Sequence, residues 1–176
     1  MYKRQSLDLL ERKTCKTNIE IKIGIIKLPS ISNFSDFDPL ENENLISIEW
    51  IRKSQNLDQF DFLIIPGSKQ TIKDQKFLEE SGLSKDIRKY SNNNGNIFGI
   101  CGGLQMLGTL LEDPFLKEGS NDSSDQKIKG IGLLPLKTKF LKNKKTKQIK
   151  SEANWPCLTE VHGFETVSYT HLTLPT

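Results

Sequence analysis

Three short apolar runs, each followed by a turn, constrain most strongly what this chain can fold into. They occupy residues 19–28, 60–65 and 97–100, and the last two end at Pro66-Gly67 and at Cys101-Gly102. Runs of this length are typical of buried β-strands. A helical pattern separates the second run from the third, which predicts an α/β domain with a largely parallel sheet flanked by helices. Ligands of such sheets bind beyond the carboxyl ends of the strands, so both turns are expected at the same edge.

The rest of the pattern predicts further elements of the same kind. A helix is expected over residues 71–90, in two pieces around Gly82, and another over 102–111, with three Leu on one face. The other expected elements are strands over 45–51 and 131–140, and loops over 30–40 and 113–130. No internal repeat is present, and the length suits one domain with a real core.

Cys101 stands where the third apolar run meets the predicted helix, with glycines on both sides. Glycine lets the backbone turn sharply and lets a ligand approach, which suits a nucleophile held on a strand-to-helix turn. The free amides of a helix start favour the thiolate, the reactive form of cysteine. The amide of Gly102 and one from the Gly67 turn are candidate donors to an oxyanion. The alternative is a small buried cysteine without a chemical role, since free Cys is among the most buried residue types.

Four segments carry a resemblance to known enzymes. Residues 99–108 read GICGGLQMLG, which resembles the nucleophile motif of class I glutamine amidotransferases. Three other segments resemble signatures of the cobyric acid synthases. They are residues 28–40 (LPSISNFSDFDPL), 65–71 (IPGSKQT) and 130–135 (GIGLLP). With Gly163-Phe164-Glu165, the resemblance runs from about residue 23 to residue 166. The nucleophile motif alone indicates only the superfamily, whereas the SNFSDFD segment separates this family from the related cobyrinic acid diamide synthases.

The resemblance implies a class I glutamine amidotransferase-like domain with a flavodoxin-like, three-layer fold. Such a domain hydrolyses glutamine and supplies ammonia for the ATP-dependent amidation of adenosylcobyrinic acid a,c-diamide side chains in cobalamin biosynthesis. The resemblance assigns the nucleophile to Cys101, the oxyanion donors to the amides of Gly67 and Gly102, and glutamine binding to Gln105. It implies no cofactor and no metal in this domain. ATP and Mg²⁺ are implied for a separate N-terminal synthetase domain, which would also bind the corrinoid substrate.

The resemblance also predicts the domain boundaries. It implies an amidotransferase-like domain over residues 19–166 that is incomplete at its C-terminal side. The chain holds no phosphate loop ending in Gly-Lys-Ser/Thr, so the ATP-dependent domain is expected to be absent from it. The family's base is a His in a His-Gly context after the GFE segment; His162 precedes that point, and His171 lies in residues 167–176, which do not resemble the family. This tail and residues 1–5 look like adapter sequence, so both ends are expected to be non-native and the chain inactive by itself.

Composition limits the remaining classes of partner. The net charge is +3, and seven of the fourteen residues from 137 to 150 are Lys, with Phe140 as the one aromatic residue among them. A solvated surface is therefore favoured over a nucleic-acid interface. Cys15, Cys101 and Cys157 form no metal-type pair, which favours free thiols in a reducing, cytoplasmic location. No apolar run is long enough to span a bilayer and no signal pattern opens the chain, so no membrane partner is expected.

Two other functions remain open. An amidotransferase that feeds ammonia to a cell-wall ligase fits the nucleophile motif, but the SNFSDFD segment disfavours it. A catalytically inactive amidotransferase-like binding or regulatory module fits the missing base. A metal site is a further possibility for the acidic residues Asp36, Asp38, Glu41 and Glu43. A loop explains them as well, since Asp and Asn bond to their own backbone in turns, and this interpretation is favoured.

Overall fold

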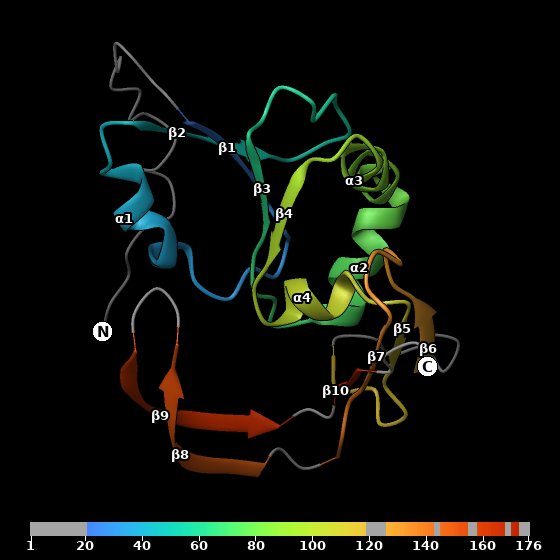
Figure 1. The fold of residues 1–176 in the computed structure, drawn as a ribbon. Coiled ribbons are helices and arrows are strands. Elements are labelled where there is room, and N and C mark those ends of the chain that lie inside the picture. Colours follow the sequence, from blue (N-terminus) through green and yellow to red (C-terminus); the bar gives the residue numbers. More distant parts are fainter. Residues whose placement is uncertain (1–20, 119–125, 143–144, 155–157, 168–169, 173–176) are drawn as a thin grey trace, which may run out of the picture.

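A four-stranded parallel sheet forms the centre of the molecule (Figure 1). The computed structural model describes residues 21–118, 126–142, 145–154, 158–167 and 170–172. The strand order is β2-β1-β3-β4, and the bounds are β1 Ile21–Ile26, β2 Ile46–Ile51, β3 Phe62–Ile65 and β4 Asn96–Gly99. All three strand pairs are parallel, so the predicted largely parallel sheet is confirmed and the ends of β3 and β4 lie at the same edge.

Helices α2 (Thr71–Glu80) and α3 (Leu83–Asn92) cover one face of this sheet (Figure 1). They are the two pieces expected around Gly82, whose φ of 81° lies in the left-handed region that glycine adopts without strain. Their apolar sides pack on β3. The residues of this layer without exposed surface are Leu63, Ile65, Ile72, Leu78, Leu83 and Ile87. Helix α2 therefore shares one buried core with β3, the strand whose end carries the Gly67 turn.

Two short helices lie on the opposite side of the sheet from α2 and α3 (Figure 1). They are the 3-10 helix η2 (Phe34–Phe37) and α1 (Asp38–Glu41). The ring centroids of Phe34 and Phe37 lie 5.3 and 5.4 Å from that of Trp50 on β2. The expectation of a plain loop over residues 30–40 was wrong for this part, because aromatic packing on the sheet orders a segment whose own composition is polar.

The rest of the described chain forms a second sheet and a hairpin. The second sheet has the order β10-β7-β5-β6, with bounds β5 Leu110–Glu112, β6 Lys127–Lys129, β7 Leu136–Lys139 and β10 Thr170–Leu172. In β7 the side chains of Leu136 and Thr138 are buried while Lys137 and Lys139 are exposed, as expected for lysines on a solvated surface. Strands β8 (Lys145–Ala153) and β9 (Thr159–Val167) pair with each other in an antiparallel hairpin.

Two predicted elements are shorter than expected. The helix expected over residues 102–111 is α4, Gly102–Met106. Beyond it the backbone of Gly108 approaches the chain so closely that a Cβ would lie 2.5 Å from the carbonyl oxygen of Leu136. The strand expected over 131–140 is β7 alone. Its first part instead caps α4, since Ile131 N–H donates to the Met106 carbonyl at 2.7 Å and Leu133 N–H to the Leu107 carbonyl at 2.9 Å.

Candidate active site

Cys101 occupies the turn between β4 and α4, where the sequence predicts it. Its φ of 49° and ψ of −109° place a residue with a side chain in a region that favours glycine. Such strain costs on the order of 1–3 kcal/mol and concentrates at functional sites. The residue is exposed to solvent. The structure therefore contradicts the alternative of a buried, inert cysteine and fits a nucleophile presented on a sharp strand-to-helix turn.

The turn at Cys101 is pressed against the end of β3. Ile100 N–H donates to the Ile65 carbonyl at 2.9 Å, and Gly103 N–H donates to the Ile100 carbonyl at 2.8 Å. A Cβ on Gly103 would lie 2.0 Å from the Ile65 carbonyl oxygen, closer than any real contact. This position therefore requires glycine, because a larger residue would push the Cys101 turn away from β3.

The Gly67 turn, which follows β3, lies beside Cys101. A Cβ built on Gly67 would lie 3.8 Å from the Cβ of Cys101, and one on Gly102 would lie 3.0 Å from the amide nitrogen of Ser68. Among the described residues, neither the Gly67 nor the Gly102 amide donates a hydrogen bond to a protein acceptor. The fold thus brings both glycines that carry the candidate oxyanion donors next to Cys101, although 35 positions separate Gly67 from Gly102 in the sequence.

Gln105 lies on α4, one turn after Cys101. Its N–H donates to the Cys101 carbonyl at 3.1 Å, so the backbone of the two residues is linked. Its side chain is partly exposed and makes no hydrogen bond to another described residue. The amide is therefore available to a ligand beside Cys101, as the assignment to glutamine binding requires.

Of the two histidines, His162 is the one whose side chain the structure describes, and it bonds to Glu160 and not to Cys101. His162 lies on β9, where its Nε2 is 3.1 Å from Glu160 Oε1 and its side chain is 51% exposed, as expected for a surface residue. His171 lies on β10 and pairs with Lys137 of β7 through the backbone. Residues 1–5 and both other cysteines, Cys15 and Cys157, lie outside the described residues.

Sequence reasoning did not find that the segment after β1 supports the Gly67 turn. Ser32 N–H donates to the Gly67 carbonyl at 2.8 Å, Lys69 N–H donates to the Ser30 carbonyl at 2.8 Å, and Ile31 and Ser68 form an antiparallel bridge. The available signal was topological. The segment follows a strand parallel to β3, so it leaves the sheet at the same edge.

Asp74 is a second residue that sequence reasoning missed. It has no exposed surface, and its carboxylate accepts from Ser68 Oγ at 2.6 Å and from Ser30 N–H at 3.1 Å. Burial raises the pKa of this carboxyl above its ordinary value, while the bonds from Ser68 and Ser30 and the charge of Lys73 act in the opposite direction. In the sequence, Asp74 is distinguished only as a polar residue on the buried side of a predicted helix.

The raised pKa of Asp74 predicts how its replacement depends on pH. A carboxyl with a higher pKa in the folded state binds more protons when folded, so its contribution to stability is present below the unfolded pKa and is lost as pH rises through the folded pKa. The amide of Asp74→Asn does not titrate. We therefore expect the difference in unfolding free energy between wild type and Asp74→Asn to move in favour of wild type as pH falls from about 7 to about 4. Urea denaturation at each pH measures it, and a difference that stays constant or moves the other way contradicts the prediction.

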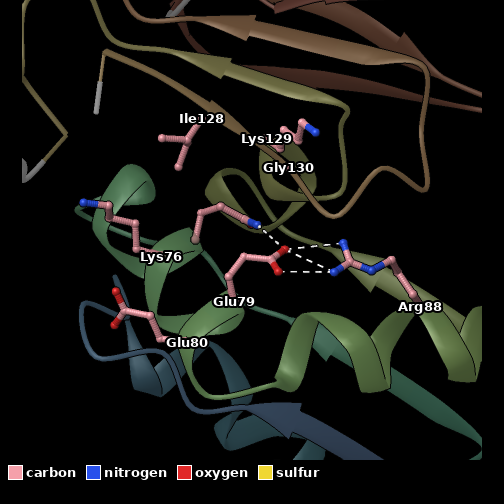
Figure 2. A pocket seen from close by; sticks show the side chains of 8 residues that line it. Lys76, Glu79, Glu80, Arg88, Ile128, Lys129 and Gly130 are labelled. Carbon is pink, nitrogen blue, oxygen red and sulfur yellow. Dashed lines mark hydrogen bonds and ion pairs between the residues drawn. The ribbon is translucent and has the colours of Figure 1, made fainter. Parts of the chain in front are cut away.

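A cavity of about 400 Å³ lies elsewhere, between α2, α3 and the residues around β6 (Figure 2). Figure 2 shows Arg88 facing Glu79, with their side chains 3.2 Å apart, and Arg88 also donates to the Ile131 carbonyl at 3.1 Å. These contacts join α2, α3 and the segment that caps α4. None of Cys101, Gly67, Gly102 and Gln105 lines this cavity, so it is distinct from the candidate site.

Two of the acidic residues of the 36–43 segment, Asp36 and Glu41, have side-chain partners within the fold. Asp36 accepts from the side-chain amide of Asn33, and Glu41 accepts from Trp50 Nε1 at 3.3 Å. Within the described ranges, no three His, Cys, Asp or Glu residues are grouped so that they could hold a metal ion. In the same ranges, no helix is both long and apolar enough to cross a membrane.

Comparison with protein families and sequences gives a consistent set of relatives. The model of a family described as the CobB/CobQ-like glutamine amidotransferase domain matches residues 22–171. The chain is 78% identical over 160 residues to a cobyric acid synthase of Prochlorococcus marinus strain MIT 9515, and 52% identical over 160 residues to that of strain NATL2A. Both alignments cover 91% of this chain, but only 31% and 32% of the relatives. The chain therefore spans less than a third of the length of these relatives.

Solved structures share the fold. PurLQS from Thermotoga maritima superposes with a TM-score of 0.56 at 13% sequence identity, covering 85% of this chain and 68% of that one. A crystal structure of glutamine amidotransferase superposes with a TM-score of 0.55 at 18% identity, covering 80% of this chain and 69% of that one. At these identities the likeness supports the fold, a mostly parallel sheet flanked by helices as in class I glutamine amidotransferases.

Proposed function

The chain belongs to the family of CobB/CobQ-like glutamine amidotransferase domains, and on this premise we propose that it is the glutamine-hydrolysing part of a cobyric acid synthase, with Cys101 as its nucleophile. The single observation that supports the role of Cys101 most strongly is its strained, exposed position beside the Gly67 turn. The high identity to the Prochlorococcus synthases supports the choice of synthase.

The proposed reaction begins with attack of the Cys101 thiolate on the side-chain carbonyl carbon of glutamine. The carbonyl oxygen becomes an oxyanion, to which the amides of Gly67 and Gly102 donate. The carbon–nitrogen bond then breaks, ammonia leaves with a proton from a general acid, and a thioester to Cys101 remains. Water hydrolyses the thioester to glutamate and restores the thiol. The covalent route divides a difficult amide cleavage into two easier steps.

The ammonia is proposed to serve the part of the relatives that this chain does not span. There it would amidate carboxylates of adenosylcobyrinic acid a,c-diamide, and ATP and Mg²⁺ would be needed in that part. In this domain the substrate is glutamine. Because His162, the one described imidazole, is bonded to Glu160 on a hairpin, we expect the 176-residue chain alone to hydrolyse glutamine slowly.

A chloroketone analogue of glutamine tests the proposal on the chain itself. The analogue binds as glutamine does and alkylates the thiol that the site presents to its carbonyl group. We expect mass spectrometry of the peptides to show labelling of Cys101, suppressed by excess glutamine, with far less labelling of Cys15 and Cys157 as internal controls. Equal labelling of all three thiols, or no protection by glutamine, would sink the proposal. An amidotransferase-like binding or regulatory module would then be the better account.

A further inference from the structure

A carboxylate without exposed surface lies behind the Gly67 turn. Asp74, on the first turns of α2, accepts from Ser68 Oγ at 2.6 Å and from Ser30 N–H at 3.1 and 3.3 Å. Its two donors come from different segments. Ser68 follows the end of β3, and Ser30 follows the end of β1. The carboxylate therefore ties together two loops at the edge of the sheet where Cys101 lies.

The two serines in turn hold the backbone on both sides of Gly67. Ser68 Oγ accepts from Gln70 N–H at 2.9 Å, and Ser30 Oγ donates to Gln70 Oε1 at 3.2 Å. The Ser30 carbonyl accepts from Lys69 N–H at 2.8 Å, and Ser32 N–H binds the Gly67 carbonyl at 2.8 Å. Every one of these contacts belongs to the two segments that Asp74 joins. The position of the Gly67 turn relative to Cys101 thus depends on a carboxylate that does not itself reach the thiol.

We infer that Asp74 is a positioning residue for glutamine hydrolysis, which acts by holding the Gly67 turn against Cys101 through Ser68 and Ser30. This inference rests on the proposed function, because it gives the turn the task of stabilising the oxyanion. Donors must lie within a few tenths of an ångström of their place for this, and small displacements in an active site cost large factors in rate.

The chemistry of the site requires a carboxylate at Asp74. Both of its oxygens face donors, one an O–H and the other an N–H, and an ionised carboxylate only accepts hydrogen bonds. Asp74→Asn has nearly the same shape but puts an NH₂ group on one of these sides. The Ser68 hydroxyl already accepts from Gln70 N–H and would have to turn away or lose its acceptor. The substitution therefore loosens the turn without opening a cavity.

Two alkylating reagents separate positioning from simple loss of structure. The glutamine chloroketone places its carbonyl oxygen against the oxyanion donors, whereas iodoacetamide alkylates any accessible thiolate by displacing iodide and needs no such donors. We expect Asp74→Asn to slow labelling of Cys101 by the chloroketone by roughly tenfold to a hundredfold. The rate with iodoacetamide should stay unchanged. Ser68→Ala removes both hydrogen bonds of Ser68 Oγ, the one to Asp74 and the one from Gln70 N–H, and leaves the buried Asp74 in place. It is also expected to slow labelling of Cys101 by the chloroketone.

Asp86→Asn is the matched control. Asp86 lies on α3 and accepts from Ser54 Oγ at 2.6 Å and from Gln55 N–H at 3.1 Å, the same pair of donor types, but it has no link to the Gly67 turn. The Asp86→Asn substitution should leave the rates of labelling of Cys101 by the chloroketone and by iodoacetamide unchanged. Circular dichroism of each variant establishes that it is folded.

Each outcome decides the inference. Unchanged chloroketone rates in folded Asp74→Asn and Ser68→Ala overturn the positioning role while the proposed function stands. If Asp74→Asn or Ser68→Ala slows labelling by the chloroketone and by iodoacetamide equally, the effect is merely structural. That result also overturns the positioning role of Asp74. If excess glutamine does not protect Cys101 of the wild-type chain from the chloroketone, the proposed function is refuted. The positioning role of Asp74 then fails with it.

Discussion

Replacing Cys101 by Ala is expected to lower glutamine hydrolysis by on the order of 10⁴-fold or more, because the thioester cannot form without the sulfur atom. Alanine keeps the Cβ, and with it the strained backbone of the Cys101 turn, so the fold should not change. The measurement is release of glutamate from glutamine. It is made in a protein of the relatives' length that carries this domain, because the chain alone is expected to turn over slowly.

The same variant gives a second readout that loss of folding would not produce. Free ammonia bypasses the glutamine site, so ammonium salts should still support the proposed ATP-dependent amidation in Cys101→Ala. Cys157→Ala, which removes a thiol outside the nucleophile motif of residues 99–108, is the matched control and should keep both reactions. Glutamine hydrolysis that survives in Cys101→Ala would exclude this residue as the nucleophile.

Gly103→Ala is expected to cost at least about 3 kcal/mol of folding free energy, because its Cβ would collide with backbone atoms that cannot turn away. That Cβ would lie 2.0 Å from the Ile65 carbonyl oxygen and 2.7 Å from the Pro66 carbonyl oxygen. Relief requires the Cys101 turn to move off the end of β3. For a chain of this size the melting temperature should fall by about 6–12 °C, and labelling of Cys101 by the chloroketone should be lost in whatever remains folded.

Two other glycines calibrate the effect of Gly103→Ala. Gly163→Ala adds the same methyl group on β9, where a Cβ would meet no atom within 4 Å, and should change stability by no more than about 0.5 kcal/mol. Gly102→Ala brings its Cβ to 3.0 Å from the Ser68 nitrogen and 3.1 Å from Thr71 Oγ1, so an intermediate cost is expected. If the Gly103→Ala protein has the same melting temperature as wild type, the Cys101 turn is not packed against the end of β3 as described.

The family and the position of the nucleophile follow from local sequence. The apolar runs of β1 and β3 form the buried strands that their composition predicts. The third run is also a strand, but β4 lies at the edge of the sheet with Phe98 exposed, so the expectation that it is buried was wrong. The turns after β3 and β4 lie at the same edge because the two strands are parallel. The glycines beside Cys101 mark a backbone that turns sharply. The resemblance of residues 99–108 and 28–40 added the family, which the match over residues 22–171 bears out.

Other features depend on contacts that sequence pattern does not encode. The Leu residues at 104, 107 and 111 fit one helix, yet α4 ends at Met106 and Leu111 is buried in β5. After α4 the chain turns to β7, where Thr109 N–H donates to the Leu136 carbonyl at 2.7 Å, a contact that the spacing of the leucines does not reveal. Likewise, the GIGLLP segment has strand-like composition but satisfies the carbonyls at the end of α4.

The sequence by itself determined the α/β order, the family and Cys101 on its turn, since each is written in neighbouring residues. Only the tertiary structure decided which polar groups support that turn. Asp74 and Ser30 are 44 positions apart, and their hydrogen bond exists because two parallel strands end at one edge of the sheet. Asp74 is buried, and a carboxylate removed from water is costly unless it has hydrogen-bond partners. The order of residues in the sequence does not reveal which partners these are.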